Sequence, residues 1–311
     1  MRKSHLMMFS SLLLMCAPLA ATSAQTGWTM VGGPGQGNLQ FSGPSGVAVD
    51  SKGHIYVADQ GNSRVVRMDD MAGTNWAAIG TDGPGRGQFS APFRVAVDSL
   101  GRVYVADKDN NRIVRFNDMS GSHWTSFGKR GKGRTQLFGP TGIAIDSADR
   151  IYIADQNNNR IVRVDDMTGK NWTAFGSFGQ GEKEFSGPSG VALDPDGRIY
   201  VTDQNNNRVV RVDDMIGEGW TAFGVKGLGD GQYFGPSGIA LDGKGRIYTA
   251  DPENNRIERI DDMTGANWAT FGDVGQGANQ LYLPGGVAVD SQGKIYVADT
   301  RNSRVVQIEW P

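Results

Sequence analysis

Tryptophan recurs along this chain at a constant interval of 48 residues, at Trp28, Trp76, Trp124, Trp172, Trp220 and Trp268. Proline keeps the same interval, at Pro44, Pro92, Pro140, Pro188, Pro236 and Pro284. A fixed period near 50 residues is typical of repeat architectures, in which each unit buries its faces only against its neighbours. Length alone would divide the 311 residues into two domains, but the uninterrupted repeat predicts a single one.

Each copy of the repeat contains four short segments that are rich in β-branched and aromatic residues and are bounded by Gly, Asp and Asn. In the second copy they are Val95–Asp98, Val103–Asp107, Arg112–Arg115 and Trp124–Gly128. This pattern indicates strands joined by hairpins. Six units of four antiparallel strands predict an all-β fold, a six-bladed β-propeller.

Residue size follows the geometry of such a ring. The first strand of each copy has alanine at its centre, and the end of each copy carries the tryptophan. Because blades diverge from an axis, small side chains inside and large ones outside fill the wedge between them. The last copy, Gly286–Glu309, stops before its own fourth strand, whereas Trp28–Gly32 aligns with the end of a blade. The N-terminal strand is therefore expected to close the ring.

The first residues have the character of a targeting segment. Arg2 and Lys3 precede an apolar stretch that ends at Cys16, and small residues follow it. This succession predicts a secretory signal peptide at 1–24, a propeller at 25–311, and a periplasmic or extracellular location. The apolar run is too short for a permanent transmembrane anchor. Acylation of Cys16 is the alternative, although Met15 before it fits a lipoprotein poorly.

Charge and cysteine content then limit the function classes. Loss of Arg2 and Lys3 changes the formal net charge from −2 to −4, which gives no overall bias toward nucleic acid or membranes. Cys16 is the only cysteine, so the exported chain would have neither disulfides nor thiol chemistry. Electrostatic recognition would have to come from a local patch.

An Asp-x-x-Asn-x-Arg motif, such as Asp59, Asn62 and Arg64, recurs in all six copies between the second and third strands. Short Asp and Asn side chains bind nearby backbone in turns, and Arg pairs with carboxylates. Repeated carboxylates could also bind calcium. Because the motif is the same in every copy, we expect it to stabilise the scaffold. We expect the same role for the repeated Asp-Asp-Met segment at the next hairpin, such as Asp165–Met167.

The stretch Pro44–Val65, with its Gly-Val-Ala-Val-Asp and Ile-Tyr-Val-Ala-Asp segments, resembles the NHL repeat. The resemblance extends over residues 26–311 and implies the propeller fold. NHL propellers include RNA-binding and protein-binding modules, bacterial extracellular sensor domains and a zinc-dependent amidating lyase. The resemblance therefore does not select one function.

Catalytic groups are scarce in the sequence. The zinc-dependent relatives use histidines, whereas only His54 and His123 follow the predicted signal peptide, in different copies. No Gly-x-Ser-x-Gly motif is present. Other six-bladed enzymes hydrolyse esters and lactones at an axial calcium, and Glu218, Glu253 and Glu258 do depart from the repeat. They fall on turns or late strands, so we predict no catalytic residue, no metal ligand and no cofactor.

The second copy departs most from the others. Phe93-Arg94 stands where the other five copies have a small residue followed by glycine, and the next connection, Lys129–Arg134, has four basic residues and no acid. Connections between blades and the turns between second and third strands emerge on the same face of a propeller. The predicted binding residues are therefore Phe93, Arg94, Lys108, Lys129, Arg130, Lys132 and Arg134.

These features predict an exported, non-enzymatic binding or scaffold module that recognises an anionic envelope polymer or an acidic protein surface. Basic side chains beside an aromatic ring favour an anionic partner. Nucleic acid is not an expected ligand of an exported protein. One alternative is a hydrolase or lyase with a metal site in the propeller channel. Another is a solvated charge cluster without a ligand.

Overall fold

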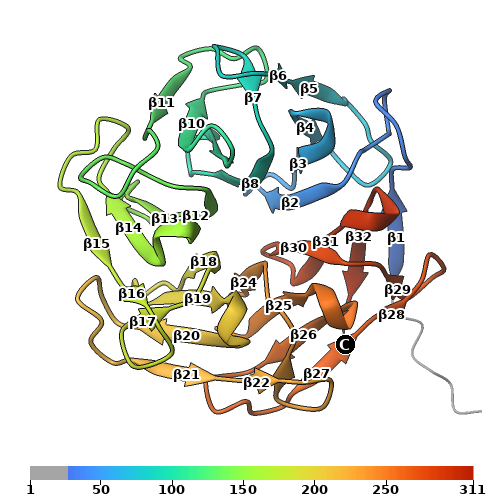
Figure 1. The fold of residues 1–311 in the computed structure, drawn as a ribbon. Coiled ribbons are helices and arrows are strands. Elements are labelled where there is room, and N and C mark those ends of the chain that lie inside the picture. Colours follow the sequence, from blue (N-terminus) through green and yellow to red (C-terminus); the bar gives the residue numbers. More distant parts are fainter. Residues whose placement is uncertain (1–26, 311) are drawn as a thin grey trace, which may run out of the picture.

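Six four-stranded antiparallel sheets form a ring around a central channel, in a computed structural model that describes residues 27–310 (Figure 1). Within each sheet the strands follow one another from the channel to the rim in chain order, except in the sheet that closes the ring. The predicted six-bladed β-propeller is confirmed.

The strands are short and recur in register with the repeat. The first blade consists of β2 (Pro44–Val49), β3 (Ile55–Asp59), β4 (Arg64–Met68) and β5 (Ala77–Ile79). The second consists of β8 (Pro92–Val97), β9 (Val103–Asp107), β10 (Arg112–Phe116) and β11 (Thr125–Phe127). The third consists of β12 (Pro140–Ile145), β13 (Ile151–Asp155), β14 (Arg160–Val164) and β15 (Thr173–Phe175).

The remaining blades repeat this order. The fourth consists of β18 (Pro188–Leu193), β19 (Ile199–Asp203), β20 (Arg208–Val212) and β21 (Thr221–Phe223). The fifth consists of β24 (Ile239–Leu241), β25 (Ile247–Asp251), β26 (Arg256–Ile260) and β27 (Ala269–Phe271). The sixth consists of β30 (Pro284–Val289), β31 (Lys294–Asp299), β32 (Arg304–Glu309) and β1 (Trp28–Val31).

Small elements lie between these strands. Parallel two-residue pairs stiffen four of the connections between blades: β6 (Thr81–Asp82) with β7 (Gln88–Phe89), β16 (Ser177–Phe178) with β17 (Glu184–Phe185), β22 (Val225–Lys226) with β23 (Gln232–Tyr233), and β28 (Asp273–Val274) with β29 (Gln280–Leu281). Single 3-10 turns follow the second strand of five blades: η1 (Gln60–Asn62), η2 (Gln156–Asn158), η3 (Gln204–Asn206), η4 (Pro252–Asn254) and η5 (Thr300–Asn302).

The N-terminal strand closes the ring, as predicted. β1 pairs antiparallel with β32, and the register runs from Trp28 opposite Ile308 to Val31 opposite Val305. The Trp28 ring also stacks on Phe271 of the fifth blade, with 5.6 Å between ring centroids. Because β1 covers the outer edge of β32, the sixth blade has the same four strands as the others.

The tryptophans fill the outer part of the wedge between blades. The Trp124 ring lies 5.1 Å from Phe89 and 5.5 Å from Phe116, centroid to centroid, and packs against the core between the first and second blades. Ala48, in the first strand of the first blade, packs against the inner part of the same core. This arrangement confirms that the tryptophans are core residues.

The Asp-x-x-Asn-x-Arg motif ties each turn to the connection that precedes the blade. Asp59 is fully buried, and its carboxylate accepts hydrogen bonds from Ser42 N at 2.7 Å, Asn62 Nδ2 at 2.7 Å and Arg64 Nε at 2.7 Å. Arg64 also donates from Nη2 to Gln40 O at 2.8 Å. Burial outweighs these hydrogen bonds and raises the pKa of Asp59 above its ordinary value. Protein donors thus occupy the carboxylate, as a scaffold role requires.

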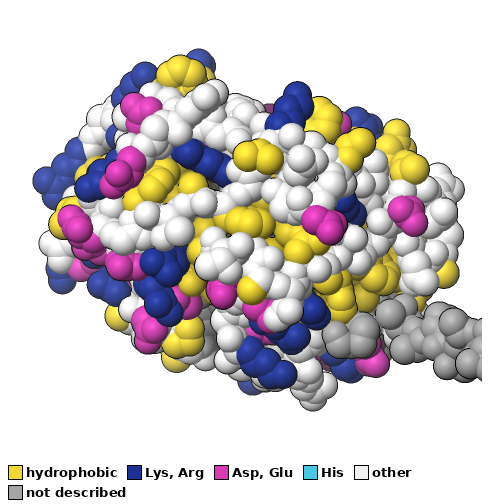
Figure 2. Space-filling view, turned by 90° about the horizontal axis from the view of Figure 1, so that it is seen from below, with side chains coloured by type: hydrophobic (Ala, Val, Ile, Leu, Met, Phe, Trp, Pro, Cys, Tyr) yellow, Lys and Arg dark blue, Asp and Glu magenta, His cyan; other side chains and the backbone are white. Residues whose placement is uncertain are grey.

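The predicted signal peptide at 1–24 and Cys16 lie outside the described residues. Within the described part of the chain, no helix has the length and apolar character needed to cross a membrane. Figure 2 views the rim of the ring, where Lys and Arg side chains are interspersed with Asp and Glu. This side of the molecule therefore presents no field of a single sign.

Candidate binding sites at the second blade and in the channel

The two faces of the ring carry different loops. Connections between blades and turns between second and third strands share one face, the connection face: Asn110 Nδ2 in such a turn donates to Gly83 O of a connection at 2.9 Å. Turns between first and second strands, such as Asp98–Arg102, emerge on the opposite face, the hairpin face. Phe93 and Arg94 begin β8 at the connection-face end of the channel.

The innermost strands close the channel at one end and leave it open at the other. The connection-face half of each innermost strand is largely buried, whereas its last two residues are partly exposed, as in the pattern of β2. The closed end, here called the neck, is formed by the residue pairs Ser45-Gly46, Phe93-Arg94, Thr141-Gly142, Ser189-Gly190, Ser237-Gly238 and Gly285-Gly286. The channel therefore opens toward the hairpin face.

The neck is narrow because backbones of adjacent blades touch there. A Cβ atom on Gly238 would lie 2.8 Å from Gly286 Cα and 2.9 Å from Gly285 O. Neither neighbouring atom can move without shifting a strand, so the position requires glycine. Ser45 Oγ in turn donates to Phe93 O at 2.9 Å across the boundary between the first and second blades.

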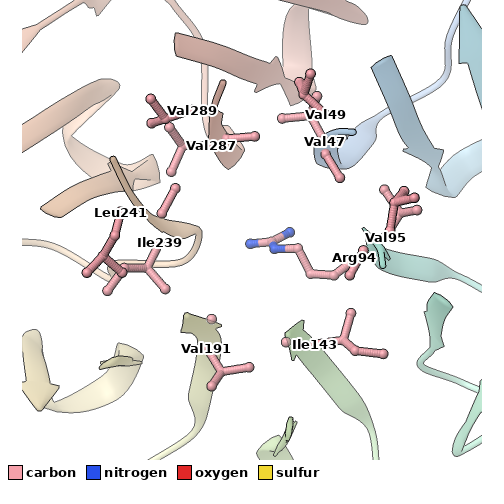
Figure 3. Close-up of a pocket in the computed structure, with 17 residues that line it drawn as sticks. Val47, Val49, Arg94, Val95, Ile143, Val191, Ile239, Leu241, Val287 and Val289 are labelled. Carbon is pink, nitrogen blue, oxygen red and sulfur yellow. The ribbon is translucent and has the colours of Figure 1, made fainter. Parts of the chain in front are cut away.

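Arg94 is the exception to this glycine ring. Its side chain extends toward the centre of the channel (Figure 3) and is only 7% exposed. Nη2 donates to Ser237 Oγ and to Gly285 O, each at 2.8 Å, while Nη1 donates to Ser45 O. These acceptors are neutral, and Arg94 forms no salt bridge within residues 27–310. Burial lowers the pKa of Arg94 to about 9, so the guanidinium stays charged at neutral pH.

A cavity of about 220 Å³, lined by aliphatic side chains and backbone, surrounds this guanidinium. Its lining includes Val47, Val95, Ile143, Val191, Ile239 and Leu241, which encircle Arg94 in Figure 3. Metal sites in proteins usually include carboxylate, imidazole or thiolate side chains, and a guanidinium repels a cation. Within the described residues no group of three His, Cys, Asp or Glu side chains could hold a metal. This lining does not fit an axial metal site.

Two cations lie close to the Phe93 ring. Lys108 Nζ is 4.8 Å and Arg94 Cζ 4.7 Å from the centroid of its ring. Burial is the main cause that lowers the pKa of Lys108, and the charge of Arg94 acts in the same direction. The structure thus brings Phe93, Arg94 and Lys108 together, as the sequence predicted. It places the Arg94 guanidinium inside the neck, however, and not on the exposed face.

The four basic residues of the connection Lys129–Arg134 are exposed on the connection face. Arg130 Cζ lies 4.7 Å from the ring centroid of Phe138. The segment just before β12 of the third blade lies next to the turn that carries Lys108: Gly139 N donates a hydrogen bond to Asn111 Oδ1 of that turn at 3.0 Å. Among the described residues, no hydrogen bond, ion pair or ring contact joins these loop side chains to Phe93 or Lys108. The predicted binding residues therefore form two neighbouring groups, and Lys108 together with the four basic residues of the loop is called the basic sector.

One part of this sector recurs elsewhere in the ring. Lys226 Nζ lies 4.5 Å from the ring centroid of Phe234, at the positions that correspond to Arg130 and Phe138. The cation beside an aromatic ring is therefore shared by two blades, whereas the loop of four basic residues belongs to one. This recurrence supplies a control for experiments on the basic loop.

The fifth blade contains a cluster of three buried polar residues that the sequence alone did not predict. Tyr233, Thr249 and Glu258 are buried, and each has an oxygen atom without a hydrogen-bond partner among the described residues. The equivalent positions elsewhere hold only aliphatic residues or phenylalanine. The sequence shows that Glu258 departs from the repeat. Only the folded structure shows that its side chain is buried between blades.

Sequence comparison matches five segments of the chain to the NHL repeat: residues 41–68, 89–116, 139–164, 185–212 and 281–308. The unmatched copy is the fifth blade, in which those apolar positions are polar. No curated protein matches the chain by sequence.

Solved structures share the fold at low identity. A protein of unknown function from Bacteroides thetaiotaomicron is 19% identical, with a TM-score of 0.71 over 92% of this chain and 76% of its own. A virginiamycin B lyase from Staphylococcus aureus is 16% identical, with a TM-score of 0.62 over 92% of this chain and 100% of its own. A putative gluconolactonase is 13% identical, with a TM-score of 0.67 over 92% of each chain. Such identities show the fold alone, and the repeat matches together with the six blades show that this protein belongs to the NHL-repeat family of β-propellers.

Proposed function

We propose that this protein is an exported binding module whose connection face recognises an anionic polymer or an acidic protein surface at the second blade. The observation that carries the proposal is Lys108, which is held half-buried against the Phe93 ring beside a second cation. Gln60, Gln156 and Gln204 occupy the equivalent position in three other blades, so this cation is specific to the second blade.

The charges of this sector are available to a ligand. Lys129, Arg130, Lys132 and Arg134 are exposed, and none of them forms a salt bridge within the described part of the chain. An anion that spans the loop and Lys108 would contact both exposed cations and a partly desolvated one. Desolvated charge contacts contribute more affinity than exposed ones, which mainly add salt dependence.

A hydrolase or lyase activity is the second candidate, because two of the similar structures carry the names of a lyase and a putative gluconolactonase. The likeness concerns the fold, on which many activities occur. The side chains that line the channel include no metal ligand. Turnover of an ester or lactone together with stoichiometric metal would favour this candidate over the binding module.

Binding can be measured by isothermal titration calorimetry with poly-glutamate and dextran sulfate as anionic probes and dextran as the neutral probe. The test variant combines Lys108→Gln with serine at Lys129, Arg130, Lys132 and Arg134. We expect it to bind the anionic probes at least about 10-fold more weakly. Its melting temperature should stay within a few degrees of that of the wild type, because loop substitutions rarely alter stability.

The matched control replaces Lys226 and Asp230 with serine in the equivalent connection after the fourth blade. It should bind as the wild type does. Equal affinity of the wild type, the test variant and the control would show that the basic sector is not a binding site. Equal binding of neutral dextran would show that charge does not drive recognition.

A further inference from the structure

We propose that the central channel is a second binding site, for a small monocarboxylate with an apolar aromatic or branched aliphatic body. The carboxylate would pair with Arg94 at the neck, and the apolar body would fill the cavity on its hairpin-face side. This site lies inside the ring and goes beyond the proposed function, which concerns exposed residues of the connection face.

The first support is the uncompensated charge of Arg94. Buried cations in proteins are normally paired with a carboxylate, because neutral acceptors do not replace the solvation of a full charge. All the acceptors of Arg94 are neutral, and its Nε–H donates to no described residue.

The second support is the cavity. Its volume of about 220 Å³ exceeds the roughly 150 Å³ of an apolar protein cavity that holds benzene. Apart from Arg94, its lining consists of glycine, alanine, valine, isoleucine and leucine. An apolar body can pack against these aliphatic side chains, whereas the hydroxyl groups of a sugar acid would find no polar side chain other than that of Arg94.

The route of entry follows from burial. At the connection-face end the neck residues Ser45, Arg94 and Ser237 are buried, and the guanidinium spans the neck. At the hairpin-face end, Val49, Val97 and Leu241 are partly exposed. A ligand would enter from the hairpin face with its apolar end trailing, and its carboxylate would meet Arg94.

The sequence also shows that the guanidinium is not required by the scaffold. The other five blades have glycine at this position, and their backbones close the neck without a side chain. A single arginine among six equivalent positions introduces one cation on the axis. This stoichiometry matches a ligand with one negative charge.

The test is isothermal titration calorimetry of the purified protein with benzoate and with hexanoate. Benzamide and hexanamide, which have the same apolar bodies without the charge, are the matched ligands. We expect both carboxylates to bind and both amides to bind at least about 10-fold more weakly. Arg94→Met, which keeps an unbranched side chain but removes the charge, should weaken carboxylate binding by a similar factor.

A second variant, Leu241→Trp, narrows the channel while Arg94 stays intact, and it should also abolish binding. The variant that lacks the basic sector of the connection face should bind both carboxylates as the wild type does, so the two proposals fail separately. Absence of binding to the folded wild type at millimolar benzoate and hexanoate would overturn the proposal. So would equal binding of the amides, or undiminished binding by Arg94→Met. If Arg94→Met does not fold, the Leu241→Trp result decides.

Discussion

Arg94 in the second blade donates a hydrogen bond from Nη2 to Ser237 Oγ in the fifth blade, across the neck, at 2.8 Å. The two residues are 143 positions apart in the chain, and their blades lie on opposite sides of the ring. The same guanidinium reaches Ser45 O in the first blade and Gly285 O in the sixth. One residue thus connects four blades at the axis.

The closing strand should be essential for stability. A chain that begins at Gly33 lacks β1 and exposes the outer edge of β32, whereas a chain that begins at Gly27 keeps the pairing. Because the truncation removes the Trp28 contact and a full row of ladder hydrogen bonds, we expect its melting temperature to fall by about 10 °C or more.

Thermal unfolding and light scattering check this prediction. The shorter chain should also associate, since an uncovered strand edge pairs with other chains. A monomer that melts within a few degrees of the control chain would contradict the assignment of β1 as the closing strand.

Glu258→Val should stabilise the fifth blade. Glu258 is 1% exposed, and burial together with the charge of Asp251 raises its pKa well above the ordinary value. Arg256 turns toward Glu258 Oε1 at 2.8 Å and lies 3.9 Å from Asp251, whereas Arg64 and Asp59 in the first blade are 2.7 Å apart. Valine, the residue of the other five blades, should restore that pair and add about 1–3 kcal/mol to the free energy of unfolding.

The increase in the free energy of unfolding caused by Glu258→Val should depend on pH. Because the folded state raises the pKa of Glu258, folded protein binds more protons than unfolded protein above the ordinary pKa of Glu. The contribution of Glu258 to stability should therefore be fully present below about pH 4.5 and be lost as the pH rises toward the raised pKa. Urea denaturation at pH 4.5 and pH 8 should show a larger gain at pH 8, and Glu253→Gln, at an exposed position, serves as the control. A gain independent of pH would show that Glu258 is not buried as an acid.

Gly238→Ala should destabilise the ring. The added Cβ would lie 2.8 Å from Gly286 Cα, so the innermost strands of two blades would have to separate. Overpacking of this kind lowers the free energy of unfolding by about 1–3 kcal/mol. Gly243→Ala is the control, because nothing lies within 4 Å of its Cβ position. Equal urea midpoints for the two variants would contradict the close contact at the neck.

Asp155→Ala should be more damaging than loss of an exposed acid. Asp155 is fully buried and accepts hydrogen bonds from Phe138 N at 2.7 Å and from Arg160 Nε at 2.8 Å. Its removal leaves the partly buried Arg160 guanidinium without a carboxylate and Phe138 N without its acceptor, so the free energy of unfolding should fall by about 3 kcal/mol. Asp196→Ala, which breaks an exposed pair with Arg198, should change stability by about 1 kcal/mol or less.

A separate measurement tests whether the repeated carboxylates bind calcium. Because protein donors occupy the Asp155 carboxylate, EDTA should not change the melting temperature. A fall in the melting temperature on addition of EDTA, reversed by calcium, would show that these carboxylates bind metal.

The second blade shows how far the sequence located the candidate sites. Comparison of the six copies identified Phe93 and Arg94 as departures from the repeat, and the expected geometry added Lys108 on the same face. The fold brings these three residues together. The same comparison assigned Arg94 to the binding face of the second blade together with the basic loop. The direction of its side chain depends on how closely six strands from different blades approach at the axis, which no single copy encodes.

The sequence by itself determined the number of blades, the strand order and the closing strand. These features follow from a period of 48 residues, alternating apolar positions and one copy without its fourth strand. The tertiary structure alone decided which face of the channel is open, that Arg94 is buried without a carboxylate, and that Glu258 lies between blades. The physical reason is that strands and turns depend on neighbours in the chain, whereas burial and cavity volume depend on side chains that the closed ring brings together from distant repeats.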